Sequence, residues 1–214
     1  MQQYTFTLYA MPMTTTAPGL RESKKRATRE SLVASAVALF TRNGYQATTI
    51  ADIAADAGVS TRTFFGYFPT KEAVLFVPLD SLALDLEKTL ATSPDDALTT
   101  LRAWVHGHAT WFDTDFRDLR ELIEASARES HTVAVTGLMF AERFTHAVAS
   151  RMRQDRGSAE DDPLPDMAAA AAVATLTIAL PLGPGTAEYP TRRPVSLLED
   201  LDTAINFVRA GLAG

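Results

Sequence analysis

Apolar residues recur at intervals of three and four along most of the chain, which is the spacing of one face of an α-helix. The first such pattern runs from Ser23 to Asn43, and Gly44 follows it as a C-terminal stop. No alternating β-branched run, internal repeat or low-complexity tract interrupts the helical pattern. We therefore predict an all-α protein.

Capping residues and prolines divide the rest of the chain into further helices. Thr49 with Asp52 resembles a capping box, so the next helix is expected to start near Ile50. Ser60 and Thr70 stand where the third and fourth helices need N-terminal caps. The remaining helices are predicted over 71–92 (bent or broken near Pro78), 94–112 (capped by Ser93), 115–127, 131–156, 166–182 and 196–212, with loops over 157–165 and 183–194.

The segment from Thr48 to Lys71 has the pattern of two short helices joined by a tight glycine turn. Ala54 is small enough for the second helix to cross closely, and Gly58 permits the positive φ of a compact turn. The second helix of such a unit faces base edges in the major groove of DNA. We expect Arg62 to contact a guanine, because its planar guanidinium matches O6 and N7; a contact to phosphate alone is the alternative. The polar residues that open this helix are Ser60, Thr61, Arg62 and Thr63.

Charge is distributed unevenly along the chain, whose net charge is −6. Residues 21–71 hold eight basic and four acidic side chains, whereas residues 72–214 hold 12 basic and 22 acidic ones. This is the layout of a basic DNA-binding unit attached to an acidic body. Lys24 and Lys25 belong to a basic arm that either contacts DNA or is merely solvated. We predict a disordered tail (1–20), a helix-turn-helix DNA-binding domain (21–70) and a helical effector-binding and dimerisation domain (71–214).

The first twenty residues carry no charged side chain, and they do not match a secretory signal. Met11 and Met13 are alternatives to Met1 as the start residue. No run approaches the roughly 18 apolar residues of a membrane span, and the chain contains no cysteine, which excludes disulfides and thiolate metal sites. We expect a cytoplasmic location.

Spaced motifs between Lys24 and Phe76 resemble those of the TetR/AcrR family of one-component regulators. The resemblance implies an all-α homodimer of about nine helices, with a DNA-binding domain in the first three and a ligand pocket and dimer interface in the rest. It also implies phosphate contacts by Thr49, Tyr67 and Lys71. Phe65 stands where the family usually has a tyrosine, and Gly66 where it often has an aromatic residue. The matching motifs are Ala38-Leu39-Phe40, Gly44-Tyr45, Thr48-Thr49-Ile50, Ile53-Ala54, Ala57-Gly58-Val59-Ser60 and Tyr67-Phe68-Pro69-Thr70-Lys71-Glu72-Ala73.

Aromatic and apolar residues in the middle of the chain could line a cavity for an apolar or aromatic effector. Ordinary core packing is the alternative for each of them, and His108 is either a polar anchor in the cavity or a core histidine. His106 and His108 point to different sides of a helix, so we expect neither a metal site nor another cofactor. The candidate pocket residues are Leu101, Trp104, His108, Trp111, Phe112, Phe116, Phe140 and Phe144.

The last two predicted helices are candidates for a dimer interface. The helix over 166–182 is apolar nearly all round, which indicates burial in a core or an interface. The monomer core is the alternative to an interface. The candidate interface residues are Ala171, Thr175, Ile178, Leu201, Ile205 and Val208.

These patterns together predict a ligand-responsive transcriptional repressor that binds a palindromic operator as a homodimer. An effector in the body would favour a state whose spacing no longer fits DNA, with the helix over 71–92 as connector. A transcriptional activator or a co-repressor-dependent regulator is the alternative within the same fold. An α-helical enzyme is a second alternative, but the sequence shows no nucleophile–base pair, phosphate loop or paired carboxylates that would support it. A third alternative is an interaction protein, which would use the helix-turn-helix only structurally.

Overall fold

The computed structural model describes residues 19–179 and 197–213 of the chain. The described residues form eleven helices and no strand, which confirms the predicted all-α class. The alternative start residues, the tail as far as residue 18 and the loop over 183–194 lie outside them. The helices are α1 (Leu20–Asn43), α2 (Ile50–Asp56), α3 (Thr61–Phe65), α4 (Lys71–Leu75), α5 (Val77–Thr92), α6 (Ala97–Gly107), α7 (Ala109–Asp113), α8 (Asp115–Glu129), α9 (His131–Arg156), α10 (Leu164–Ala179) and α11 (Leu197–Ala213).

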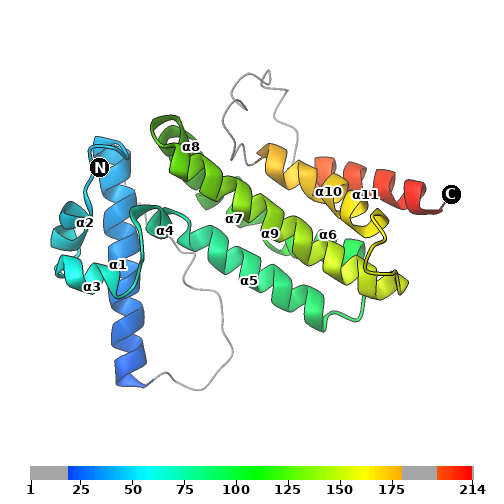
Figure 1. The fold of residues 1–214 in the computed structure, drawn as a ribbon, viewed down its shortest axis with the longest axis horizontal. Coiled ribbons are helices and arrows are strands. Elements are labelled where there is room, and N and C mark those ends of the chain that lie inside the picture. Colours follow the sequence, from blue (N-terminus) through cyan, green and yellow to red (C-terminus); the bar gives the residue numbers. More distant parts are fainter. Residues whose placement is uncertain (1–18, 180–196, 214) are drawn as a thin grey trace.

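Two groups of helices meet at α4 (Figure 1). The first three helices lie together at one end of the molecule, where α2 contacts both α1 and α3. In the larger group, α9 packs against α5, α6, α8 and α10, and α11 packs against α10 and α6. Two direct connections also join the groups, because α1 contacts α4 and α8. None of the described helices is long and apolar enough to cross a membrane.

The core of the first group explains the position of α3. Buried residues of α1 recur at helical spacing from Leu32 to Phe40, so one stripe of this helix faces inward. Ile53 of α2 and Phe64 of α3 are completely buried in the same core. Phe64 therefore anchors α3 in this core, while Thr61, Arg62 and Phe65 of this short helix are exposed.

The predicted break near Pro78 is confirmed. The helix over 71–92 is divided at Phe76, whose φ of −93° and ψ of 3° interrupt the regular backbone. Pro78 lies in the first turn of α5. Backbone N–H groups in a first turn form no hydrogen bond within the helix, so a proline, which lacks the N–H, costs nothing there. Phe76 itself is buried in the core.

The prediction of a single helix over 94–112 is wrong about where the helix starts, and it misses a break within that range. It begins at Ala97, because Asp96 rather than Ser93 supplies the cap: Asp96 Oδ1 accepts from the backbone N–H groups of Leu98 and Thr99, both at 3.0 Å. It ends at Gly107, where His108 Nδ1 lies 2.7 Å from the Trp104 carbonyl oxygen. The backbone N–H of His108 also donates to this carbonyl oxygen, at 3.2 Å, so the helical hydrogen bond is kept at the end of α6.

Candidate nucleic-acid interface and effector-domain core

The helix-turn-helix has the capping geometry predicted for it. Thr49 Oγ1 accepts from the Asp52 backbone N–H at 3.1 Å, and Asp52 Oδ2 accepts from the Thr49 N–H at 2.9 Å, which completes the capping box of α2. Hydrogen bonds from Thr49 also lower the pKa of Asp52. At the turn, Gly58 has a φ of +69°, a conformation that side chains with a Cβ rarely adopt.

Ser60 caps the N-terminus of α3, and its hydroxyl contacts that of Thr63. Its Oγ accepts from the Thr63 backbone N–H at 3.0 Å and lies 2.8 Å from Thr63 Oγ1. Both predicted base-contacting hydroxyls are therefore already paired with each other. Whether they contact DNA stays a prediction.

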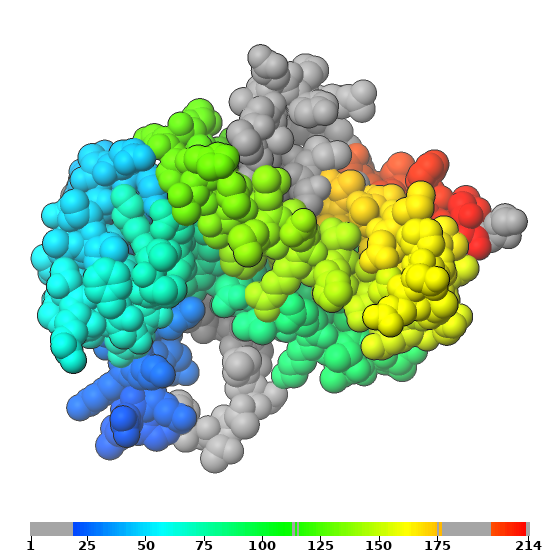
Figure 2. Space-filling model, viewed as in Figure 1, coloured from blue at the N-terminus to red at the C-terminus, as the bar shows by residue number. Residues whose placement is uncertain are grey.

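Thr61 and Arg62 lie on the exposed surface of α3, at the end of the molecule opposite α10 and α11 (Figure 2). The Arg62 guanidinium forms no hydrogen bond or ion pair with the residues the structure describes. Its five N–H donors are thus available to an acceptor outside the chain. Of the predicted DNA-contacting residues in α3, Arg62 has the geometry best suited to reading a base.

Lys71 has a role inside the protein that sequence reasoning missed. Its Nζ donates to the carbonyl oxygens of Tyr45 at 2.7 Å and Thr48 at 2.9 Å, and it lies 4.0 Å from the centre of the Tyr45 ring. Burial lowers the pKa of Lys71, and the nearby carboxylates of Glu72 and Glu129 oppose this effect. An ammonium has three donors, so one remains for the predicted phosphate contact beside Thr49.

Tyr67 is half-buried, and it packs against the core of the first group. Its ring centre lies 6.5 Å from that of Phe68. Phe68 also receives Arg29, whose guanidinium carbon lies 5.3 Å from the ring centre. A phosphate contact by the Tyr67 hydroxyl stays a prediction.

The expected basic arm is part of a helix. α1 begins at Leu20, within the range predicted as tail, so Lys24 and Lys25 lie on its second turn and are exposed. The first turns of α1 extend beyond α2 and α3 in Figure 1 and protrude at the lower left of Figure 2. These cations therefore have positions fixed by a helix, which a disordered arm would not give them.

The structure brings the candidate pocket residues together as packed side chains. Around Trp104, ring centres lie 4.7 Å away for His108, 6.2 Å for Phe112 and 6.3 Å for Phe144. Trp111 lies 5.2 Å from Phe112 and 5.1 Å from Phe116. Leu101 is fully buried in the same core.

Phe140 lies apart from this ring network, because it stacks on Phe76 at 5.2 Å with an interplanar angle of 12°. The aromatic residues of the body thus contact the α4–α5 junction as well as one another. An effector site among them stays a prediction.

Polar groups border the aromatic cluster. Trp104 Nε1 donates to Asp85 Oδ2 at 2.7 Å, and His108 Nε2 lies 3.6 Å from the same oxygen. Trp111 Nε1 is buried and has no hydrogen-bond partner among the described residues. Because an unpaired buried donor is costly, this indole N–H could bind an acceptor on a ligand.

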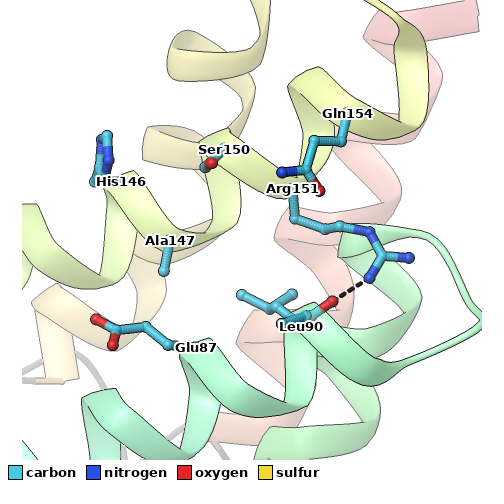
Figure 3. Close-up of a pocket in the computed structure, with 8 residues that line it drawn as sticks. Glu87, Leu90, His146, Ala147, Ser150, Arg151 and Gln154 are labelled. Carbon is cyan, nitrogen blue, oxygen red and sulfur yellow. Dashed lines mark hydrogen bonds between the residues drawn. The ribbon is translucent and has the colours of Figure 1, made fainter.

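Two hollows lie outside the aromatic cluster. The first, of about 250 Å³, lies between α5 and α9, and its lining includes Glu87, His146 and Gln154 (Figure 3). Arg151 borders it and donates to the Leu90 carbonyl. The second, of about 140 Å³, lies between α6 and α11. Neither hollow is lined by a candidate pocket residue.

No group of three or more potential metal ligands occurs among the described residues.

Three of the predicted dimer-interface residues lie inside the chain. Leu201, Ile205 and Val208 are buried, because this face of α11 packs on α10 and α6 of the same chain. Contact of these residues with a second copy stays a prediction. Helical periodicity identified the apolar stripe but could not tell which partner covers it. Ala171 is half-buried, and the side chains of Thr175 and Ile178 lie outside the description.

Residues 32–76 match the family model described as "Bacterial regulatory proteins, tetR family". This segment, which holds the helix-turn-helix, belongs to the TetR family. It is 42% identical over 69 residues to the HTH-type transcriptional regulator TcmR of Streptomyces glaucescens, a match that covers 32% of this chain and 30% of TcmR. It is 32% identical over 118 residues to the regulator EthR of Mycobacterium tuberculosis, covering 52% and 54%. The chain thus spans about half or less of the length of these curated relatives.

Solved structures share the fold over most of the chain. A TetR-family regulator from Syntrophomonas wolfei has a TM-score of 0.60 at 19% identity, covering 89% of this chain and 97% of its own. The SmeT–triclosan complex has a TM-score of 0.58 at 23% identity, covering 86% and 91%. Thermus thermophilus FadR in complex with lauroyl-CoA has a TM-score of 0.52 at 24% identity, covering 86% and 94%. The proteins compared in these two paragraphs are regulators rather than enzymes, as the sequence predicts for this chain.

Proposed function

We propose that this TetR-family protein is a ligand-responsive transcriptional repressor that binds a palindromic operator as a homodimer. The observation that carries the proposal is the surface of α3, where Arg62 is exposed and unpaired among the described residues while Phe64 anchors the helix. A helix held in this way can enter the major groove without losing its own packing. Its DNA-binding domain would be residues 21–70, followed by an effector-binding and dimerisation domain over 71–214.

Phosphate contacts from several elements would hold α3 in register. Thr49, Tyr67 and Lys71 surround the helix-turn-helix, and Lys24 and Lys25 extend the basic surface along α1. Such contacts fix orientation and carry no sequence information, whereas contacts to base edges discriminate. We assign discrimination chiefly to Thr61 and Arg62.

The dimer would form through the outward face of α10 and α11. Met167 is 66% exposed on α10 and Phe207 is 76% exposed on α11, and Ala170 beside Met167 is exposed as well. Large exposed apolar side chains next to small residues favour close contact with a second copy. Two DNA-binding domains would then meet successive major grooves about 34 Å apart.

The effector would be a small apolar or aromatic molecule that opens the cluster around Trp104 and Trp111. Buried rings supply its apolar surface, and the unpaired Trp111 Nε1 supplies a donor. SmeT with triclosan and FadR with lauroyl-CoA give two probes of this class. The chain contains only two tryptophans, both in the cluster, so a bound probe should change the intrinsic fluorescence and weaken operator binding. As a regulator of genomic DNA, the protein would work in the cytoplasm.

Selection of binding sites from a random DNA duplex pool tests the proposal. The native protein should enrich an inverted repeat, and Arg62→Ala should lose preference at particular positions. Arg156→Ala is the matched control, because it removes the same charge from an exposed site at the end of α9. Enrichment of no sequence by the native protein, even at low salt, would contradict the proposal.

A further inference from the structure

One large apolar side chain of the DNA-binding unit lies at the surface of α3. Phe65 is 55% exposed, and it is the last residue of this helix. Every other large apolar side chain between Arg21 and Phe68 is buried or half-buried. A single exposed apolar side chain is common at protein surfaces, so it is the location of this ring that matters: on the proposed DNA-reading helix, a bound duplex would cover it.

The position of Phe65 places its ring on the same side as the candidate base-reading residues. It follows Thr61 by four residues and Arg62 by three, and side chains at these intervals share one helix face. Its ring meets that of the buried Phe64 edge-on, with centres 5.7 Å apart and planes at 86°. Gly66, which follows, has no side chain that could cover it.

The chemistry of the groove limits what such a ring can contact. A phenyl ring has no hydroxyl for a phosphate, and it has no donor or acceptor for a base edge. Base edges in the major groove offer hydrogen-bonding groups and one apolar group, the 5-methyl of thymine. We propose that Phe65 contacts a thymine 5-methyl group in each half-site, and so makes thymine the preferred base at one position.

This inference rests on the proposed DNA-binding function, and it is tested on the operator selected by the native protein. Each thymine of the operator is replaced in turn by deoxyuridine, which differs only in lacking the methyl group. At one position per half-site, the replacement should weaken binding about fourfold, and replacement in both half-sites about 15-fold, since one methyl group leaves an apolar contact.

Variants at position 65 assign the effect to the ring. Phe65→Ala should bind thymine and deoxyuridine operators equally, while Phe65→Tyr keeps the ring and should keep the difference. Leu84→Ala removes a side chain of similar exposure, 54%, from α5, and it should also keep the difference. Circular dichroism verifies that each variant is folded.

Two results would overturn the inference alone: an enriched operator in which no thymine methyl affects affinity, or a methyl effect that persists in Phe65→Ala. Contact of the ring with deoxyribose carbons would give the first of these results. Failure of the native protein to enrich any DNA would instead overturn the proposed function, and the inference with it.

Discussion

Glu129 Oε2 accepts a hydrogen bond from the backbone N–H of Gln46 at 2.8 Å, although the two residues are 83 positions apart. Gln46 returns the contact, because its Nε2 donates to the Glu129 carbonyl oxygen at 2.7 Å. A Cβ on Gly44 would lie 3.3 Å from Glu129 Oε1. The last turn of α8 is thus clamped to the segment between α1 and α2, independently of the connection through α4.

Glu129→Ala should weaken this clamp and reduce operator affinity. It removes one hydrogen bond to a charged acceptor at an exposed site, so we expect a loss of about 0.5–1.5 kcal/mol in unfolding free energy. Urea denaturation and a DNA-binding titration measure the two effects. Glu121→Ala, an exposed residue of the same helix, is the control. Equal behaviour of both variants would show that the clamp contributes nothing.

Lys71→Met should destabilise the protein by about 1–3 kcal/mol. It keeps a similar apolar stem but leaves the carbonyl oxygens of Tyr45 and Thr48 without their donor. Chemical denaturation measures the loss, with Lys88→Met, an exposed lysine of α5, as control. If Lys71 serves only to contact phosphate, affinity for DNA will fall while stability stays unchanged.

Tyr45→Phe should change how stability depends on acidic pH. The Tyr45 hydroxyl donates to Glu72 Oε1. Burial tends to raise the pKa of Glu72, but the bond from Tyr45, with smaller effects of backbone and Thr70 hydrogen bonds and of the Lys71 charge, outweighs it and leaves that pKa lowered. A carboxyl whose pKa is lower in the folded state stabilises the protein above its unfolded pKa of about 4.3, and this contribution is lost as pH falls through the folded value.

We therefore expect Tyr45→Phe to cost about 1 kcal/mol at pH 7, since Glu72 is only partly buried. The difference from the native protein should shrink as pH falls below about 4. Urea denaturation at pH 7, 5 and 3.5 measures it, and Tyr67→Phe is the matched control. A difference that is constant with pH would exclude Glu72 as the partner that matters.

Adjacent residues of α11 should respond in opposite ways to a charge. Phe207→Glu alters an exposed side chain, so it should give a folded monomer. Val208→Glu places an unpaired carboxylate in the chain's own core and should prevent folding. Sedimentation analysis and circular dichroism distinguish the outcomes. A dimer that survives Phe207→Glu would place the interface elsewhere.

Local signals in the sequence predicted most of the fold correctly. The caps Thr49, Ser60 and Thr70 act within three residues of themselves, so their roles follow from spacing alone. The interruption at His108 was missed, because the apolar spacing from Leu101 through Trp104 to Phe112 continues across it and gives no local signal of a break.

The sequence predicted only those features of the candidate site that depend on residues close to one another in the chain. Exposure of Arg62 follows from its place at the start of α3, beside a buried Phe64. The bonds of Lys71 join residues more than twenty positions apart, and the burial of Leu201 depends on two other helices. Such contacts exist only once the chain has folded, so periodicity could not assign them.

The contact between Glu129 and Gln46 also matters for hybrid regulators, in which the DNA-binding domain of one protein is joined to the effector-binding domain of another. A splice before Lys71 would respect the order of the helices, yet it would pair a foreign α8 with the native turn from Gly44 to Gln46. Chimaeras made with this chain should therefore respond to their inducer only when the residue at position 129, which contacts Gln46, is transferred together with the DNA-binding domain.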